Sequence, residues 1–388
     1  MPIRSTIADL VPDARSWRRE IHQNPGLLYD VEETAKFVAD KLRAFGCDEV
    51  KTGIGRTGVV GVIHGAKGSS SRTIGLRADM DALPIEEETN LPYRSKIPGK
   101  MHACGHDGHT AMLLGAARRL AETRDFAGKA VVIFQPAEEG GAGAMAMIDD
   151  GLMDKFGVEE VYGMHNMPAL PVGAFKLRKG PLMASADEIT ITVEGQGSHA
   201  AMPHQGVDPV AVGAQIVTAL QTIASRNVDP LDPCVVSVTQ FHAGATNNVI
   251  PQSAWLNGTV RTLKAATRDF IEKRIHEIAA GLAAAGGATA RVEYRRGYPT
   301  TVNHGPQTDF AARVARKVAG DANVDDAAAP VMGAEDFSFM LEARPGAFIF
   351  LGNGDTAKLH HPAYDFNDDA LAYGMSYWVE LVETALAP

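Results

Sequence analysis

The order of strands and helices along the chain constrains its fold more than any other feature of the sequence. Short apolar runs, which are typical of buried strands, alternate with segments whose apolar residues recur at helical spacing. This alternation predicts an α/β domain with a central, largely parallel sheet, because each helix returns the chain to the start of the next strand. The predicted buried strands are TGVVGVIHG, RTIGLRADM, KAVVIFQP, EEVYGMHN and GAFIFLGNG.

Helices are predicted around these strands. In the first helix, apolar residues from Ile7 to Ile21 recur at helical spacing, and Gly46 is suited to end the second. A turn rich in Gly and Ser at residues 66–71 joins the first two strands. The predicted helices cover residues 6–22, 31–45, 109–122, 142–150, 307–319 and 368–386.

A different pattern begins near residue 184. The segment DEITITVEGQ alternates apolar and polar residues, as a half-exposed strand does. Helices at 208–226 and 267–284 and strands at 234–243, 253–263 and 288–296 complete the order β-α-β-β-α-β, which is the ferredoxin-like split unit. The earlier alternation then resumes. We therefore predict a small α+β domain, residues 184–296, inserted into a larger α/β domain formed by residues 1–183 and 297–388.

Composition excludes several classes of protein. A net charge of −10 without long basic runs argues against a nucleic-acid partner. No segment approaches the roughly 18–20 apolar residues that cross a membrane. The N-terminal segment has no long apolar core, so no signal peptide is expected. Three distant cysteines imply no disulfide framework, and we expect a cytoplasmic protein.

The segment GKMHACGHDGHT concentrates one cysteine and three histidines within eight positions. A structural zinc site usually has paired cysteines, haem attachment needs Cys-x-x-Cys-His, and a thioredoxin-like redox pair needs a second cysteine. None of these patterns is present. A Cys-His nucleophile and a metal site with further ligands elsewhere remain as alternatives.

Further candidate ligands follow other predicted strands. Glu138 and Glu139 come directly after KAVVIFQP, His165 ends the next strand, and His360 and His361 follow GAFIFLGNG. Ligands of open α/β sheets gather outside the carboxyl ends of the strands, so these segments should meet at one edge. Cysteine, histidine and glutamate together favour a transition metal over calcium or magnesium.

The two adjacent glutamates predict a division of roles. Neighbours in an extended chain point to opposite sides, so both are not expected to ligate in the same way. One can bind the metal while the other faces the substrate. A free carboxylate beside a metal-activated water is the arrangement for metal-assisted hydrolysis.

Nine segments in order carry a resemblance over nearly the whole chain. The sequence resembles the amidohydrolase branch of the aminoacylase and glutamate-carboxypeptidase family of metallopeptidases. This branch includes hippurate hydrolases, N-acyl-amino-acid deacylases and plant indoleacetyl-amino-acid hydrolases. The resemblance implies a metal-binding α/β domain interrupted by a lid domain that often dimerises. The nine segments are LRADMDALPI, HACGHDGHTAML, FQPAEEGGAGA, GMHNMP, GSHAAMPH, NNVIP, GTVRT, GAEDFSFM and HHPAYDF.

Carried over by position, the resemblance also implies roles for single residues. Glu138 would be the general base, and His199 would steady the oxyanion, often from the neighbouring subunit. Asn248 and Arg261 would hold the substrate carboxylate, which the planar fork of arginine can pair in a bidentate manner. The implied metal ligands are Cys104, His106, Glu139, His165 and His361.

The sequence departs from the wider family at one motif. The wider family has His-x-Asp-x-x-Pro where this chain reads DMDALP from Asp79 to Pro84, so a histidine ligand is missing there. The amidohydrolase branch shares this change. The resemblance therefore implies one or two divalent ions, with manganese, zinc and nickel all compatible with the branch.

Three functions are open from the sequence. The first is a metal-dependent hydrolase that releases a carboxylic acid and a free amino acid from N-acyl amino acids. The second is a dipeptidase or aminopeptidase on the same scaffold, and the third is a non-catalytic metal- or ligand-binding protein, against which the pair Glu138–Glu139 argues. We expect a homodimer or a higher homo-oligomer formed through the lid, and no membrane partner. Histidines that stand alone in the sequence, such as His22, are expected to lie at the surface or to bond locally.

Overall fold

The computed structural model describes residues 5–68 and 70–388 and divides into two compact units. Unit 1 comprises the described residues up to Gly180 together with Val302–Ala329 and Asp336–Pro388, and unit 2 comprises Pro181–Thr301 and Pro330–Glu335. The segment Pro330–Glu335 was not predicted to belong to the inserted part. Residues 1–4 of the N-terminal segment and residue 69 of the turn at 66–71 lie outside the described residues.

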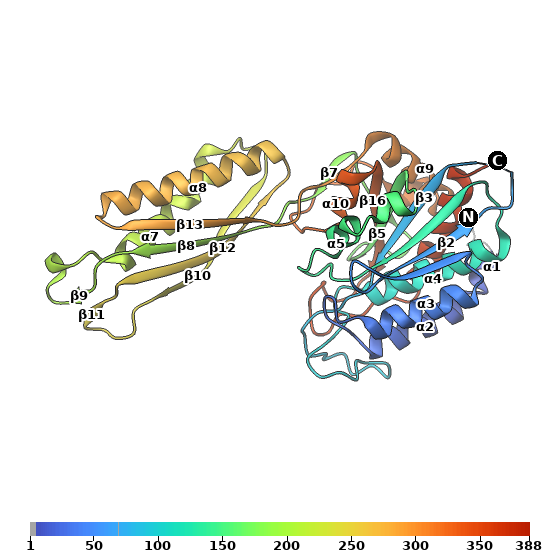
Figure 1. Cartoon of the computed structure of the whole chain (residues 1–388), viewed down its shortest axis with the longest axis horizontal. Helices are drawn as coiled ribbons and strands as arrows, with labels where there is room; N and C mark the ends of the chain where they lie inside the picture. Colours follow the sequence, from blue (N-terminus) through green and yellow to red (C-terminus); the bar gives the residue numbers. More distant parts are fainter. Residues whose placement is uncertain (1–4, 69) are drawn as a thin grey trace. The chain divides into compact units, whose positions relative to one another are not determined.

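Unit 1 is built on an eight-stranded sheet (Figure 1). Its middle strands β4, β3, β5 and β16 are parallel, whereas β2 pairs antiparallel with both β1 and β4. The prediction of an α/β fold with a largely parallel central sheet is confirmed. In sheet order the strands are β1 (Glu49–Ile54), β2 (Gly58–His64), β4 (Lys129–Gln135), β3 (Thr73–Asp79), β5 (Glu160–Pro168), β16 (Gly346–Gly354), β6 (Phe175–Lys176) and β15 (Val324–Asp325).

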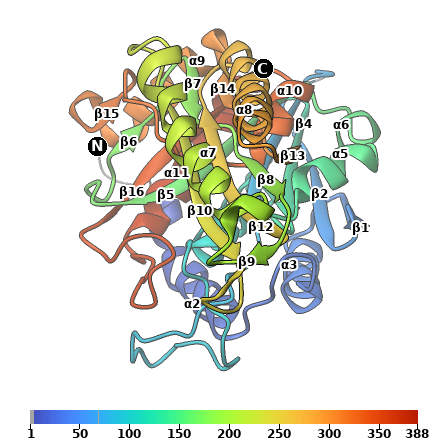
Figure 2. The ribbon, with the colours of Figure 1, turned by 90° about the vertical axis from the view of Figure 1, so that its left-hand side faces the viewer.

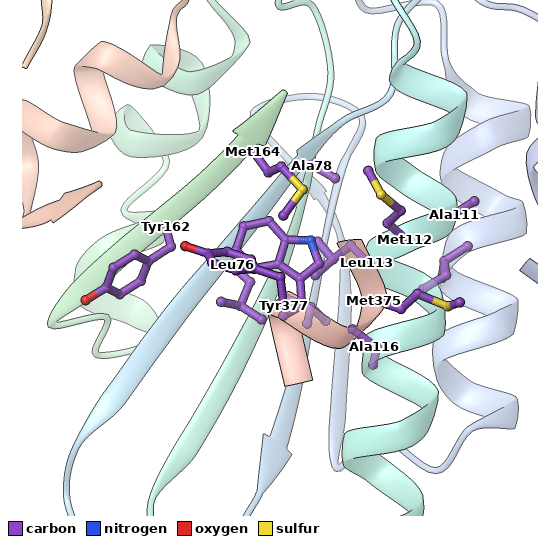
Figure 3. Packing of buried hydrophobic residues seen from close by; sticks show 14 of the residues in the cluster. Leu76, Ala78, Ala111, Met112, Leu113, Ala116, Tyr162, Met164, Met375 and Tyr377 are labelled. Atoms are coloured by element: carbon purple, nitrogen blue, oxygen red, sulfur yellow. The ribbon is translucent and has the colours of Figure 1, made fainter. Parts of the chain in front are cut away.

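The middle strands are buried on both faces because helices cover them, and this is why they read as continuous apolar runs. Helix α4 (His106–Thr123) contacts β3 and also helices α2 (Val11–Gln23) and α11 (Ala370–Ala385). Figure 3 shows this core, with Leu76 and Met164 on the strands and Met112 on α4. The core therefore fixes the position of α4 on the sheet.

The remaining elements of unit 1 are shorter or more peripheral. Helices α3 (Glu32–Ala44) and α9 (Gly305–Ala319) pack against β2 and β16, respectively. No helix formed by the described part of the chain is long and apolar enough to cross a membrane. The other elements are α1 (Ser5–Ala8), α5 (Gly143–Asp149), α6 (Leu152–Lys155), η3 (Asp321–Asn323) and α10 (Phe337–Ala343). Strands β7 (Gly180–Met183) and β14 (Thr301–Asn303) each contain residues of both units.

Unit 2 has its own sheet and its own core. The strands lie in the order β10 (Cys234–Ala243), β12 (Ser253–Thr262), β8 (Asp187–Glu194) and β13 (Thr289–Arg296), all antiparallel to their neighbours. Helices α7 (Pro209–Thr222) and α8 (Ala265–Ala285) lie side by side against this sheet (Figure 2). Four short elements complete the unit: the paired strands β9 (Ser198–His199) and β11 (Val249–Ile250), the 3₁₀-helix η1 (Pro203–Gln205) and the π-helix η2 (Ile223–Asn227).

Candidate metal centre

The chain reverses sharply at Gly105, between two predicted ligands. Gly105 precedes the first residue of α4 and has a φ of 90°, which residues with a side chain rarely adopt. A Cβ atom there would lie 2.4 Å from Asn166 Nδ2 and 2.5 Å from Tyr364 Oη. Glycine is therefore required both by the turn and by close packing. The turn lets Cys104 and His106 lie in one cluster.

Five predicted residues converge where β3, β4 and β5 end. Cys104 Sγ lies 3.4 Å from His165 Nε2. The ligand atoms of Cys104, His106 and His165 lie within 4.8 Å of one another, and so do those of His106, Glu138 and Glu139. Cys104, His106 and His165 are buried. The structure thus brings these five side chains together from segments that are far apart in the sequence.

Several polar atoms of this cluster are buried without a hydrogen-bond partner. Within residues 5–68 and 70–388, no group hydrogen-bonds to either ring nitrogen of His106 or to Glu139 Oε1. Unpaired buried polar atoms are costly, so native proteins usually satisfy them with a ligand, water or ion. Thiolate, imidazole and carboxylate donors together suit a divalent transition-metal ion. The residues present therefore fit the implied metal.

The protonation of the ligands follows from their burial and their neighbours. Burial opposes a charge on His106, but the carboxylates of Asp79, Asp81 and Glu139 outweigh it and raise its pKa to about 10. Burial and the nearby glutamates raise the pKa of the Cys104 thiol well above its ordinary value. Without metal both groups hold a proton, and a bound ion has to displace those protons.

His165 is held with one ring nitrogen toward the cluster. Its Nδ1 donates a hydrogen bond of 2.6 Å to the backbone oxygen of Asn166, which leaves Nε2 facing Cys104. Burial and the neighbouring His109 lower the pKa of His165 well below its ordinary value, so the ring is neutral. A neutral imidazole whose other nitrogen is bonded is the form that ligates metals.

The structure brings His360, and not His361, to the cluster. His360 Nε2 lies 3.4 Å from Glu139 Oε1, and its ligand atom groups with those of Cys104 and Glu139. His361 Nδ1 instead accepts a hydrogen bond from the backbone of Ala363 at 3.0 Å. The reason is local: His360 has a φ of 63°, and its backbone N–H donates to the oxygen of Ala103. The structure thus places His360 at the cluster, whereas the family resemblance implied His361.

Asp81 fixes the backbone of the glutamate pair. One carboxylate oxygen accepts from Glu138 N at 3.0 Å and the other from Glu139 N at 3.1 Å. Among the ligand groups that contain Cys104 or His106, Glu139 takes part in two and Glu138 in one; Glu138 also groups with other carboxylates. Glu139 is thus the more central of the two.

Asp79 stands at the position of the missing family histidine and has partners of its own. Its oxygens accept from His109 Nδ1 at 2.6 Å and from Arg77 Nη1 at 2.8 Å. Burial works against its ionisation, but His106, Arg77 and His109 hold the pKa of Asp79 well below its usual range. His109 Nε2 in turn accepts from the backbone N–H of Asn166. Asp79 and His109 therefore connect α4 to the end of β5.

The predicted lid residues lie in unit 2, in two places. His199 and Asn248 are exposed neighbours on β9 and beside β11, where Asn248 O accepts from Ala200 N. Arg261 lies on β12, eight residues after Ser253, the first residue of that strand. At a rise of about 3.3 Å per residue, roughly 25 Å of strand separate Arg261 from that end of the sheet. One copy of unit 2 does not gather all three side chains at one point.

His22 is a residue whose surroundings the sequence did not reveal. It was expected at the surface or in a local hydrogen bond, but it is fully buried in α2. Its Nδ1 donates to Asp107 Oδ2 at 2.8 Å. Burial lowers its pKa, but the Asp107 carboxylate outweighs burial and raises it to about 9. Its place on the apolar face of α2, one residue after Ile21, was the available signal.

Fold and site together define a metal-dependent hydrolase. The sequence model of Peptidase family M20/M25/M40 matches residues 75–384. The chain is 46% identical over 375 residues to the hippurate hydrolase of Campylobacter jejuni, with 97% of each chain covered. It is 39% identical over 370 residues to the N-acetylcysteine deacetylase of Bacillus subtilis, covering 95% of this chain and 96% of the relative.

A solved structure agrees with these sequence comparisons. The YXEP protein of Bacillus subtilis, described as a dinuclear metal binding peptidase from the M20 family, superposes with a TM-score of 0.85 at 35% identity. The match covers 98% of this chain and 99% of that one. The chain belongs to peptidase family M20/M25/M40, and it is a metal-dependent amidohydrolase. The family resemblance drawn from the nine sequence segments is confirmed.

Proposed function

We propose that the protein hydrolyses N-acyl amino acids to a carboxylic acid and a free amino acid. The observation that carries this proposal is the carboxylate of Glu138 beside the cluster of Cys104, His106 and Glu139. Binding alone would not need a base next to the ligands. Hippurate and N-acetylcysteine, named for two of the relatives, are both N-acyl amino acids.

The proposed metal centre holds one or two divalent ions of manganese, zinc or nickel. When bound, such an ion supplies a Lewis acid that polarises the amide carbonyl and lowers the pKa of a nucleophilic water. The burial of Cys104, His106 and His165 limits competition from bulk water. The proposed ligands are Cys104, His106, Glu139, His165 and, in place of His361, His360.

Glu138 performs the two proton movements that amide hydrolysis requires. Its carboxylate first accepts a proton from the attacking water and then delivers that proton to the departing amine nitrogen. Asp81 holds the Glu138 backbone and thereby fixes the point from which the side chain reaches out. Glu139 is assigned to ligation because its side chain groups both with Cys104 and His360 and with His106.

Arg261 is proposed to bind the substrate carboxylate. No carboxylate of the described chain lies within 4.0 Å of its guanidinium group. The guanidinium instead donates hydrogen bonds to Thr259 and to the backbone oxygen of Val260. Because burial lowers its pKa, this partly buried cation gains from an anionic partner. Arginine pairs a planar carboxylate in a bidentate manner.

His199 and Asn248 are proposed to act on a substrate bound to a second copy of the chain. The strand length that separates them from Arg261 supports this assignment, because the three side chains are needed around one substrate. The proposal therefore includes a homodimer formed through unit 2. A cytoplasmic location also belongs to it, since all three cysteines are free.

The experiment that tests this function compares substrates and metals on the purified protein. Hippurate, N-acetyl amino acids and dipeptides are incubated with the metal-free protein and with added Mn²⁺, Zn²⁺ or Ni²⁺, and Glu138→Gln is the matched control. We expect metal-dependent release of the free amino acid from the N-acyl compounds, and none from the control. A preference for dipeptides would establish the peptidase instead. Metal binding without turnover of either class would reject both.

A further inference from the structure

Helix α2 carries two buried ionisable residues that the proposed chemistry does not use. Arg18 and His22 lie one helical turn apart, and neither exposes any surface to solvent. Charged groups are rarely buried in this way unless they have specific partners. The partners of Arg18 and His22 connect α2 to two segments that carry proposed metal ligands.

The first connection runs to the start of helix α4. Asp107 follows His106 directly, and its Oδ2 accepts a hydrogen bond of 2.8 Å from His22 Nδ1. Arg18 Nη1 lies 3.4 Å from the same oxygen. The other ring nitrogen of His22 lies 3.3 Å from Glu87 Oε2, so the imidazole is held from both sides. Movement of α2 would therefore displace the first turn of α4 and with it His106.

The second connection runs to the segment between β16 and α11, which contains His360. Arg18 Nε donates a hydrogen bond of 2.8 Å to Asp368 Oδ1, and Arg18 Nη1 lies 3.4 Å from Asp365 Oδ1. Tyr93 bonds to the second oxygen of Asp365 at 2.9 Å and stacks 4.5 Å from the Arg18 guanidinium. A single buried guanidinium thus joins both ligand-bearing segments.

We propose that Arg18 and His22 are positioning residues of the metal centre. They set the separation of His106 and His360, which come from segments more than 250 positions apart in the sequence. This inference rests on the proposed function in one respect only: it takes His106 and His360 to be metal ligands. Residues behind the ligands usually govern metal affinity, and their loss typically weakens binding about 10–100-fold.

The test measures metal affinity and the spectrum of the bound ion. Arg18→Met and His22→Phe each remove one link to Asp107, whereas His22→Gln keeps a donor at this position. Arg19→Met is the matched control, because Arg19 also bonds to Asp368, at 2.7 Å, and stacks on Tyr93, but within the described residues it forms no hydrogen bond or ion pair with Asp107. The purified full-length proteins are titrated with Mn²⁺ for affinity and with Co²⁺ for the absorption bands of the Cys104 thiolate complex.

We expect the dissociation constant for Mn²⁺ to rise about 10–100-fold in Arg18→Met and His22→Phe, with altered Co²⁺ bands. Arg19→Met should match the parent protein, and His22→Gln should recover most of the affinity. Thermal unfolding of the metal-free proteins measures their stability. A merely structural effect would lower the melting temperature and leave the Mn²⁺ affinity and the Co²⁺ spectrum unchanged. That result would overturn the proposal.

Two further outcomes are distinguishable. If Arg18→Met does not fold, the comparison of His22→Phe with His22→Gln decides, and equal affinities in this pair overturn the proposal. If the parent protein shows no cobalt–thiolate band, the ligand assignment that underlies the proposed function fails, and the positioning role fails with it. If the parent shows the band and every variant binds as tightly as the parent, only the positioning role is wrong.

Discussion

Glu138 and Glu139 are neighbours in the chain, but the proposed function assigns them different roles. We expect Glu138→Gln to lower turnover on the order of 10²–10⁴-fold while metal content stays near normal, because the base is lost and no ligand is. Glu139→Gln should lose metal first. Metal analysis and turnover of both variants check this. Loss of metal from Glu138→Gln, with full occupancy in Glu139→Gln, would reverse the two roles.

The two adjacent histidines 360 and 361 give a second matched pair. We expect His360→Ala to weaken metal binding at least about tenfold, because its ring lies beside Glu139. His361→Ala should change affinity little, since its ring only accepts a local backbone hydrogen bond. Titration with a divalent ion measures both variants. A larger loss in His361→Ala would restore the assignment drawn from the sequence.

At the residue scale, the sequence predicted most residues of the cluster. It did not predict residues such as His22, which hold the segments that carry the proposed ligands. Glu138, Glu139 and His165 could be placed together because the carboxyl ends of parallel strands meet at one edge. The choice of Cys104 and Glu139 as ligands came from the family resemblance. The choice between His360 and His361 depends on one left-handed backbone conformation, which no pattern of residue types indicates. His22 was missed because its partner Asp107 is 85 positions away.

At the scale of elements, helices α4 and α11 approach each other too closely for any added side chain at Gly374. A Cβ atom there would lie 2.0 Å from Met112 Sδ in the filled core. We expect Gly374→Ala to lower the free energy of unfolding by about 1–3 kcal/mol through overpacking. Urea unfolding followed by circular dichroism measures the change.

Gly281 provides the control for this prediction. It also lies inside a helix, α8, but a Cβ atom there would meet nothing within 4 Å. Gly281→Ala should therefore raise the free energy of unfolding by about 0.5–1 kcal/mol, through the better helix propensity of alanine. If both substitutions shift stability in the same direction, close packing is not what keeps glycine at position 374.

Helices and strands could be predicted where their burial requires an apolar pattern in the sequence. Strands β3, β4, β5 and β16 are buried on both faces and read as apolar runs. Strand β1 was missed because the sequence EVKTGI is largely exposed and shows no apolar pattern. Helix α4 begins at His106, three residues before the predicted start, because the histidines of its first turn lie beside the carboxylate of Asp79 and so give the sequence no apolar pattern there.

At the scale of the whole molecule, the proposed dimer makes a prediction of its own. His199→Ala and Glu138→Gln proteins should each be nearly inactive, and mixing them should restore part of the activity. A mixed dimer retains one site with an intact Glu138 and a His199 from the other copy. Turnover after subunit exchange is the measurement, and mass spectrometry confirms that mixed dimers form. Proven exchange without recovery would assign His199 to its own chain.

The position of β16 in the sheet has a consequence for how the protein is made. β16 pairs with β5, although residues 169–345 separate the two strands in the chain. During synthesis on the ribosome the N-terminal part emerges first, with Cys104 and His165 already present, while the neighbour of β5 and the segment that carries His360 are still untranslated. The nascent chain therefore cannot assemble the complete proposed centre before the segment that carries His360 has been translated.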